Sequence, residues 1–292
     1  MAQFSDEIAL RAIYKYKLAQ RVPLDGSASF AEISRASGLR EDLVERFLHQ
    51  AMSNHIFTED HHGSVAHTAA SRLLVVDSDA YDAVGLMTCE LSPVGMKTLD
   101  AIETWPGSEE QTETAWTLQN EPGMSPFAFL AKHPERARRF GAGMRYFGRG
   151  QGWDLSYLVQ GYPWETLDYP GAIFVDIGGG HGTVSQALSR ATRHMRFVVQ
   201  DLPGTVGDGR NALAKALEGR VRFAEHDFFS EQPIRDADVY FFRWILHNWS
   251  DKYCRKILRS LIPALKNGAR VLIYEFVLAD GPETRWTQKS SR

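Results

Sequence analysis

The sequence has few cysteines and no long apolar run, and each absence excludes a class of protein. Its 292 residues include two cysteines, Cys89 and Cys254, far apart in the chain. Isolated thiols argue against a disulfide framework and favour a reducing compartment, and neither has a partner at metal-ligand spacing. No apolar run approaches the ~18 residues of a transmembrane helix. The first residues, MAQFSDEIALRAIYKYK, lack the apolar core of a signal peptide. We therefore expect a cytoplasmic protein.

The sequence also lacks an excess of basic side chains. Its formal net charge is −3, so it has no electrostatic attraction for nucleic acid or for an anionic membrane. Neither partner is expected. Its composition, 43% hydrophobic and 24% charged, is that of a globular protein. The length suffices for one large domain or two ordinary ones.

Residues 8–70 predict a helix-turn-helix followed by a short hairpin. In SASFAEISRASGLR, Ser29 and Glu32 form a capping box, and Gly38 marks the turn between two helices. HIFTEDHHGSVAHT then alternates around a turn at residues 61–63, as a small hairpin does. These elements together predict a winged helix. The second helix has one apolar face, made of Val44, Phe47, Leu48 and Ala51.

A winged helix suggests DNA binding, but the charges of its second helix oppose that function. Glu41, Asp42 and Glu45 accompany Arg40 and Arg46 there, and carboxylates repel phosphate. We favour a winged helix used for packing or for formation of a homodimer. No metal site is expected at the histidines of the wing region, because neighbouring histidines there are typical of a solvated turn: His61, His62 and His67.

Residues 80–165 predict mainly helices, with loops at WPGSEE and NEPGMSP. Long apolar and aromatic side chains recur through this region, either as core or as the walls of a pocket for a flat substrate. The sequence leaves both readings open. We expect a winged-helix domain over residues 1–110 and a helical linker lining the substrate pocket over 111–165. The side chains concerned are Met96, Trp105, Phe127, Phe129, Phe140, Met144, Phe147 and Trp153.

Residues 166–292 alternate between strands and helices. Apolar, β-rich runs lie at residues 172–177, 196–201, 221–226, 239–246 and 270–278. Between the first two, TVSQALSRATRH predicts a helix with Val184, Leu188 and Ala191 on one side. Continuous apolar strands separated by helices predict a parallel sheet covered on both faces. The fold class is therefore α/β, a Rossmann-like doubly wound sheet, with ligands at the carboxyl ends of the strands.

The first strand runs directly into a glycine-rich loop, VDIGGGHGT. Gly178, Gly180 and Gly182 allow a tight turn and a close ligand, and the next helix offers free N–H groups at its start. Such a loop is also compatible with a generic nucleotide site or a simple strand-to-helix turn. However, the spacing differs from the dinucleotide fingerprint, and Asp176 precedes the loop. A carboxylate there suits a ligand with an amino group better than a pyrophosphate.

Acids follow the next two strands. Asp201 ends the second strand, where a carboxylate can accept both hydroxyls of a ribose. Asp227 and Phe228 follow the third strand, where a carboxylate can accept an adenine N–H while the ring packs on the base. Each acid alone is more often a cap or turn residue. Glycines and acids at three successive strand ends together predict a nucleoside site.

These motifs resemble those of small-molecule O-methyltransferases, of the plant caffeate and flavonoid type and of fungal secondary metabolism. The similar segments are VDIGGGHG, VVQDLP, HDFF, FFRWILHNWSD and ARVLIYEFVL, and in the first half LVERFLHQAMSNHIF, GSVAHTAASRLL, HPERARRFGAGM and GYPWETL. The resemblance implies that the cofactor is S-adenosyl-L-methionine and that the first domain forms a dimer. It implies that Gly178 lies by the amino-acid end of the cofactor, Asp201 at the ribose, and Asp227 with Phe228 at the adenine.

Four further residues belong to the predicted site. Arg243 matches a family position usually held by lysine or arginine near the cofactor, and Asp176 and Gly180 complete the cofactor-binding set. His247 follows the fourth strand, beside the expected cofactor crevice. A phenol attacks a sulfonium methyl poorly until its proton is removed, so we expect this histidine to act as general base.

The resemblance implies that an acid orients the base, and Glu275 matches the first such acid. In the apolar run 270–278 a lone carboxylate would be costly, which also argues for a partner. An O-methyltransferase acting on an aromatic natural product is the favoured function. A cofactor-binding pericyclic enzyme and a non-catalytic truncated paralogue are the alternatives. The sequence does not name the acceptor.

The two ends of the chain depart from the family pattern. Relatives have further helical residues before ALRAIYKYKLAQ, and after residue 278 they continue with a helix and two strands. We therefore expect a truncated member of the family with only five strands. The fifth strand is then an exposed apolar edge, and the polar tail that ends in KSSR is predicted to be disordered.

Overall fold

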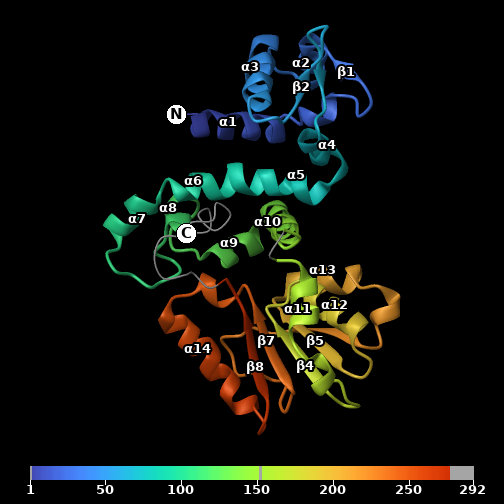
Figure 1. Cartoon of the computed structure of the whole chain (residues 1–292). Coiled ribbons are helices and arrows are strands. Elements are labelled where there is room, and N and C mark those ends of the chain that lie inside the picture. The colour runs from blue at the N-terminus through green and yellow to red at the C-terminus, as the bar shows by residue number, and fades with distance from the viewer. Residues whose placement is uncertain (1, 151–152, 277–292) are drawn as a thin grey trace. The chain divides into compact units, whose positions relative to one another are not determined.

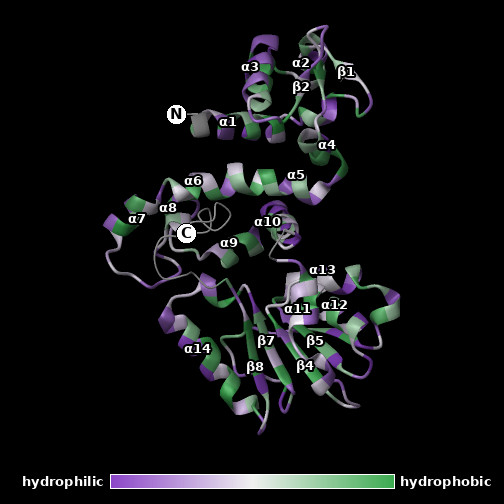
Figure 2. Cartoon of the chain, in the orientation of Figure 1, coloured by the Kyte–Doolittle hydropathy of each residue, from purple (hydrophilic) through white to green (hydrophobic). Residues whose placement is uncertain are grey.

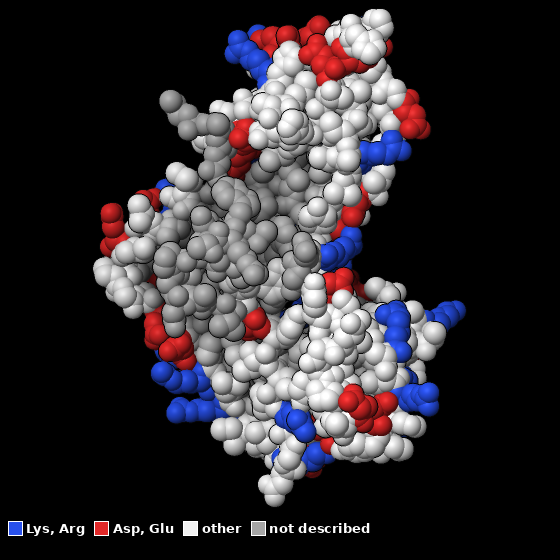
Figure 3. Space-filling model, in the orientation of Figure 1, with Lys and Arg blue, Asp and Glu red and all other residues white. Residues whose placement is uncertain are grey.

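A computed structural model describes residues 2–150 and 153–276 and divides the chain into two compact units (Figure 1). Unit 1 comprises Met1–Asp154 and unit 2 comprises Leu155–Arg292. The division falls inside the predicted helical linker, residues 111–165. Within residues 2–150 and 153–276, no helix has both the length and the apolar character needed to cross a membrane. On the face shown in Figure 3, charges of both signs lie on each unit, without a continuous basic surface.

Unit 1 begins with helices and a small antiparallel sheet. The helices are α1 (Ala2–Lys15), α2 (Phe30–Ser37) and α3 (Glu41–Met52), and the strands β1 (Ser27–Ala28), β2 (Thr58–Glu59) and β3 (Val65–Ala66) pair in the order β1-β3-β2. The predicted capping box of Ser29 and Glu32 is present, and Gly38 ends α2 in the left-handed conformation, with φ 74°. On α3, Val44, Leu48 and Ala51 are buried as predicted, whereas Phe47 is only partly buried.

The rest of unit 1 is helical, as predicted. Its helices are α4 (Ala69–Val76), α5 (Ser78–Gly85), the π-helix η2 (Leu86–Leu91), α6 (Ser92–Gly95), α7 (Thr98–Thr104), α8 (Ala115–Gln119), α9 (Pro126–Lys132) and α10 (Pro134–Phe147). Of the eight long or aromatic side chains singled out in the sequence, Phe129 is buried and Met96 is 82% exposed. The other six are partly buried. Neither assignment, to the core or to the walls of a pocket, therefore holds for all eight side chains.

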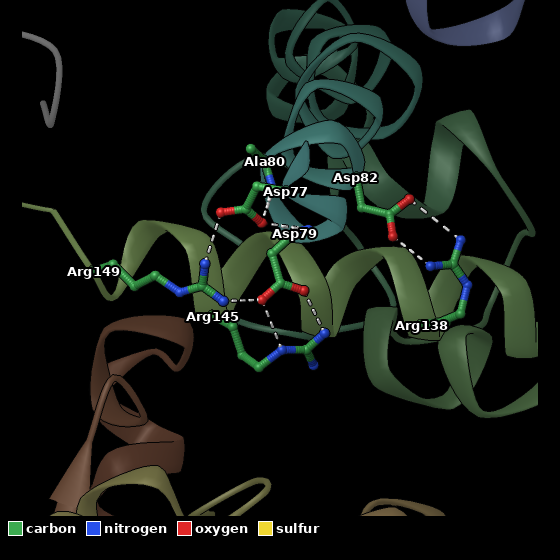
Figure 4. A network of polar contacts seen from close by, with 7 residues as sticks. All are labelled: Asp77, Asp79, Ala80, Asp82, Arg138, Arg145 and Arg149. Carbon is green, nitrogen blue, oxygen red and sulfur yellow. Dashed lines mark hydrogen bonds and ion pairs between the residues drawn. The ribbon is translucent and has the colours of Figure 1, made fainter. Parts of the chain in front are cut away.

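A row of ion pairs joins α5 to α10 (Figure 4). Asp79 receives Arg145, with Nη2 to Oδ1 at 2.7 Å, and also Arg149. Arg138 pairs with Asp82 one turn further along α5. The two helices carry opposite charges on facing sides, so the pairing selects how they align.

Unit 2 is built on a parallel sheet. Its strands are β4 (Ile173–Ile177), β5 (Arg196–Asp201), β6 (Val221–Glu225), β7 (Val239–Arg243) and β8 (Arg270–Tyr274), in the order β6-β5-β4-β7-β8. Its main helices are α11 (Leu155–Gly161), α12 (Thr183–Ala191), α13 (Pro203–Ala212) and α14 (Asp251–Leu261). The predicted α/β class is confirmed. The chain order reverses between β4 and β7, which places a ligand crevice at their carboxyl ends.

Alternation along the strands gives this sheet two buried faces. Phe174 and Phe197 point into one core, shared with Leu188 of α12, whereas Val175 and Ile177 belong to another, which α14 covers. Figure 2 shows the hydrophobic residues following the strands, with polar ones interspersed along the helices. The apolar side chains of β8 are less protected, and Val271 and Ile273 are exposed.

Three predicted boundaries were wrong. The fourth strand ends at Arg243 rather than Leu246, because Trp244 takes a left-handed conformation with φ 56° and interrupts the extended chain. The helix after the glycine loop ends at Ala191, which is exposed. The fifth strand ends at Tyr274, so that Glu275 follows the strand. Residues 277–278 of the predicted strand and the polar tail lie outside the described residues.

Candidate functional site

Contacts link the carboxyl ends of all five parallel strands. The glycine loop after β4 provides most of them. A methyl group added at Gly178 would lie 2.4 Å from Ile245 Cδ1, after β7, and 3.7 Å from Phe228 Cε1, after β6. The N–H of Gly180 donates to Oδ2 of Asp201, at the end of β5, at 2.8 Å. Every predicted site residue except Asp176 therefore lies at or beyond a strand end on one edge of the sheet.

The loop backbone fits a closely approaching ligand at Gly180. Gly178 and Gly180 both have left-handed φ angles, 66° and 58°. A methyl group at Gly178 would overlap Ile245, so that position faces protein. A methyl group at Gly180 would meet no atom within 4 Å. The loop therefore presents Gly180 to open space.

Asp201 supports this loop from the neighbouring strand. Its Oδ1 accepts the N–H of Leu202 at 2.8 Å, and its Oδ2 accepts that of Gly180. Burial raises the pKa of the Asp201 carboxyl, and the hydrogen bonds from Leu202 and Gly180 act in the opposite direction. A carboxylate has about four acceptor positions, so the N–H groups of Leu202 and Gly180 and the side chain of Thr205 leave capacity for about one hydroxyl of a ligand.

Asp176 lies beneath the loop. It is 2% exposed, and a methyl group at Gly179 would lie 2.6 Å from its Cγ. The hydroxyl of Ser185, in the first turns of α12, donates to its Oδ2 at 2.7 Å. Burial raises the pKa of Asp176 to about 6, against the lowering effects of Ser185 and Arg243. These contacts describe a residue that supports the loop from inside the sheet.

Asp227 and Phe228 extend the site past β6. Asp227 is exposed, and its Oδ1 accepts the N–H of Phe229 at 2.9 Å. The Phe228 ring is partly buried and packs edge-on against Trp249, with ring centres 5.6 Å apart. This contact holds an aromatic side chain beside an exposed carboxylate, as the sequence predicts for the adenine end.

Arg243 is a partly buried cation with two covered donors that have no partner in the described part of the chain. These donors are Nε and Nη2. The guanidinium stacks over the Trp244 ring at 4.1 Å, which accounts for the unusual backbone conformation there. Burial lowers the pKa of Arg243, opposed by Tyr274, Asp176 and Glu275. Two buried donors on a cation suit an anionic group of a ligand, such as a carboxylate.

Glu275 and His247 come together as the resemblance implies. Glu275 Oε2 lies 2.8 Å from His247 Nδ1, the distance of an ion pair, although Oε2 makes no well-aligned hydrogen bond within residues 153–276. Glu275 Oε1 accepts the N–H groups of Ile245 and Leu246 at 2.8 and 2.9 Å. His247 therefore lies on a short 3-10 helix, Leu246–Asn248, rather than directly at the strand end. The Glu275 carboxylate therefore contacts both the backbone at residues 245–246 and the ring of His247.

Several contributing residues have no signal in the sequence. Ser185 is recognisable only as a polar residue in an otherwise amphipathic helix. Ile245 fills the space over Gly178 but is one of many apolar residues near that strand. The left-handed Trp244 is unexpected, because bulky side chains disfavour positive φ. Their roles depend on contacts between strand ends, which the chain order alone does not give.

Comparisons with known proteins agree with this geometry. The sequence profile of the O-methyltransferase domain family matches residues 109–291. O-methyltransferase AMT9 of Alternaria alternata is 44% identical over 287 residues, which are 95% of this chain and 65% of AMT9. The chlorophenol O-methyltransferase of Trichoderma longibrachiatum is 38% identical over 294 residues, 99% of this chain and 63% of that enzyme. The chain thus spans slightly less than two thirds of these relatives.

Solved structures share the fold at lower identity. OxaC in complex with SAH and oxaline has a TM-score of 0.84 at 24% identity, covering 97% of this chain and 73% of OxaC. A structure described as a pericyclic reaction enzyme has a TM-score of 0.80 at 21% identity, covering 98% of this chain and 74% of that one. Both likenesses establish the fold of the chain.

Proposed function

Because the chain belongs to the O-methyltransferase domain family, we propose that it transfers a methyl group from S-adenosyl-L-methionine to a hydroxyl of a small aromatic molecule. The observation that carries this proposal is the 2.8 Å approach of His247 Nδ1 to Glu275 Oε2. This pair lies at the sheet edge that also holds the glycine loop. A methyl transferase needs a base there, whereas a pericyclic enzyme does not.

The residues present fit the cofactor. The unpartnered donors of Arg243 suit its carboxylate, and Asp201 retains acceptor capacity for about one ribose hydroxyl. Phe228 and Asp227 offer a ring and an acceptor for adenine, and Gly180 allows close approach. When bound, the cofactor supplies an electrophilic methyl group on a sulfonium. Asp176 contributes indirectly, through the loop that it supports.

Two side chains of this site, His247 and Glu275, take part in proton removal. His247 Nε2 is the atom that takes the proton from the acceptor hydroxyl, because Nδ1 faces Glu275. The carboxylate of Glu275 stabilises the positive charge that forms on the ring. Its second oxygen holds the backbone of residues 245–246 and so keeps the ring in place. Holding the acceptor in line with the methyl group contributes further rate.

The names of the relatives support a role in fungal secondary metabolism. They include the chlorophenol O-methyltransferase and an O-methyltransferase of the grayanic acid biosynthesis cluster of Cladonia grayi, 38% identical over 275 residues. A chlorophenol is a small aromatic hydroxyl compound. We extend this acceptor class to the chain, and we place the protein in the cytoplasm.

Substituting the base tests the proposed function. His247→Ala is expected to lower turnover of a phenolic acceptor about 10²–10⁴-fold, the usual contribution of a general base. Affinity for S-adenosylhomocysteine, measured by calorimetry, should stay unchanged. His194→Ala is the matched control, because His194 is an exposed histidine of the same unit. Unchanged turnover in His247→Ala would remove the base from the mechanism. Absence of both turnover and cofactor binding in the folded protein would favour the non-catalytic alternative.

We also propose that unit 1 forms a homodimer. Apolar side chains at i, i+3 and i+6 are unusually exposed around α7: Met96 at 82%, Leu99 at 71% and Ile102 at 59%. Light scattering after gel filtration should give a dimer mass for the natural chain and a monomer mass for Leu99→Glu with Ile102→Glu. Ile262→Glu, at an exposed position of unit 2, should leave the mass unchanged. A monomeric natural chain at micromolar concentration would contradict the dimer.

A further inference from the structure

A buried pair of glutamines joins β5 to the loop that follows β6. Gln200 is 1% exposed and Gln232 is 2% exposed. Each side-chain amide donates from Nε2 to the Oε1 of the other at 2.8 Å. A buried amide without a partner is costly, but these two satisfy each other. The pair therefore fixes the loop, residues 226–234, to the strand that ends at Asp201.

The loop is also held at its far end and by α14. Oε1 of Gln232 accepts the N–H of Ile234 as well, at 2.9 Å. The backbone N–H of Gln232 donates to the carbonyl oxygen of Ser260, on α14, at 3.0 Å. Oγ of Ser260 lies 2.6 Å from the carbonyl oxygen of Phe228 and 2.8 Å from that of Ile257, either of which can accept its proton. Strand β5 and helix α14 thus both contact the loop.

The strand end at Gln200 supports the glycine loop too. The carbonyl oxygen of Gln200 accepts the N–H of Gly179 at 3.1 Å, and the carbonyl oxygen of Asp201 accepts that of His226 at 3.0 Å. Asp227 itself is exposed, so its place depends on the backbone that carries it. The glutamine pair therefore sets the spacing between the carboxylates of Asp201 and Asp227.

We propose that Gln200 and Gln232 are positioning residues, which hold the backbone of residues 226–234 so that Asp227 and Phe228 meet the adenine of the cofactor. Two apolar side chains could fill the same volume, but apolar burial is not directional. Paired amides allow one alignment, because each N–H needs the oxygen opposite to it. This inference rests on the proposed function, which takes S-adenosyl-L-methionine as the ligand.

Hydrogen exchange of the natural chain tests the loop without any ligand or substitution. The backbone N–H groups of Gln232 and Ile234 should exchange at least about 100-fold more slowly than those of an unstructured peptide, because both are hydrogen-bonded. NMR resolves the two amides separately. Exchange of both at the rate of an unstructured peptide would overturn the proposal.

A second test compares two ligands that differ only at the base. S-inosylhomocysteine carries an oxygen in place of the exocyclic amino group of S-adenosylhomocysteine, so it has no amino N–H to donate to Asp227. Calorimetric titration of the natural chain should show S-adenosylhomocysteine bound at least about tenfold more tightly, the cost of losing a charged hydrogen bond.

Substitution of both glutamines tests whether the pair sets that preference. Gln200→Met with Gln232→Met removes both amides at similar size, so thermal stability should change little. The preference should fall below about threefold, whereas Gln160→Met, at an exposed position on α11, should keep it. An unchanged preference in the double variant would overturn the proposal. If that variant does not fold, Gln232→Asn, which keeps an amide one carbon shorter, replaces it with the same two outcomes.

Combination with Asp227→Ala separates positioning from a general structural role. Asp227→Ala alone should abolish the preference, because the acceptor for the amino group is gone. Adding Gln200→Met and Gln232→Met should then leave the ratio of the two affinities unchanged. A further change of this ratio would show that the glutamines do not act through Asp227, and would overturn the assignment.

These titrations, with an assay of methyl transfer, separate this inference from the proposed function. Equal affinity of the natural chain for the two ligands would overturn the positioning role and leave the methyltransferase proposal standing. The expected pattern of affinities in a chain that transfers no methyl group would support the positioning role and overturn the methyltransferase proposal. A folded chain that binds neither ligand would overturn both.

Discussion

Asp176 shows how position in the sheet sets the chemistry of one residue. It belongs to β4, under the glycine loop, and burial raises its pKa to about 6 from an ordinary value of 3.8. Between pH 3.8 and about pH 6, Asp176 is protonated in the folded chain and ionised in the unfolded chain. The free energy of unfolding therefore falls as pH rises through this window. The shift corresponds to about 3 kcal/mol.

This linkage predicts that a neutral side chain at position 176 raises the free energy of unfolding by an amount that depends on pH. Asp176→Asn still accepts from Ser185 but has no carboxylate to desolvate. Relative to the natural chain, its free energy of unfolding should rise by about 3 kcal/mol between pH 4 and pH 7. Urea unfolding at about pH 4, 5.5 and 7 measures the difference. Asp208→Asn, at an exposed position on α13, is the control. A constant difference across this range would contradict the buried charge.

The sequence predicted which residues reach the site but not what each one contacts. Asp201 and Phe228 were predicted because carboxyl ends of parallel strands share one edge, and position at a strand end can be read from the pattern, whereas Glu275 was predicted from the family resemblance and placed inside the fifth strand. Asp176 precedes its loop by two residues, yet its side chain is buried beneath that loop. Such orientation depends on the packing of Ser185 and Gly179, which no periodicity encodes.

At the scale of elements, ion pairs join α5 to α10 and to Arg149, just after that helix. Asp79 is the centre of the row, because it receives both Arg145 and Arg149 (Figure 4). Helix α10 also lies close to η2, the segment that follows α5. Gly143 of α10 leaves room for the side chain of Leu86, since a methyl group there would lie 2.4 Å from Leu86 Cδ2. Helix contact and charge pairing therefore reinforce each other.

Removing the charge of Asp79 should destabilise unit 1. Asp79→Asn removes the carboxylate that Arg145 and Arg149 share, while Arg149 keeps its pair with Asp77, and we expect the free energy of unfolding to fall by on the order of 2–3 kcal/mol. This lies below the range for fully buried pairs because both arginines are partly exposed. Asp100→Asn, which breaks the exposed pair with Lys97, should cost less than about 1 kcal/mol. If Asp79→Asn and Asp100→Asn lowered the thermal stability equally, the row of ion pairs would contribute no more than one exposed pair.

These helix contacts could not be predicted from the sequence. The region was recognised as helical, but arginines on one helix and acids on another 66 residues away look like ordinary solvated faces. Only the folded chain brings them together. The same holds for Trp116 Nε1 and Arg136 Nε, donor atoms that are covered, and unpartnered among the described residues, only in the folded chain.

At the scale of the whole molecule, the two units have separate hydrophobic cores. We expect two calorimetric transitions, of which S-adenosylhomocysteine raises only that of unit 2. At a concentration of 100 times Kd the stabilisation is about 2.7 kcal/mol, or about 5–10 °C. Gly85→Ala identifies the other transition, because its methyl group would lie 2.3 Å from Cζ of Tyr14 in unit 1. A single transition that shifts as one would show that the units unfold together.

The α/β class could be predicted because parallel strands covered on both faces read as continuous apolar runs between helices. The strand ends were less predictable. The fourth strand stops at Arg243 because a stacked guanidinium and a capping carboxylate turn the chain, whereas its apolar run continues to Leu246. Tertiary contacts therefore decide where the histidine lies.

The parallel sheet has a consequence for how this chain can diverge. Connections that enter the strands, such as residues 192–195 and 265–269, lie at the amino edge, opposite the site. Insertions there can accumulate without moving a functional side chain. Connections that leave the strands carry Gly180, Asp201, Phe228 and His247, and one inserted residue would displace its neighbours from the edge. Evolutionary change in length is thus confined to one side of the sheet, and change in specificity to the other.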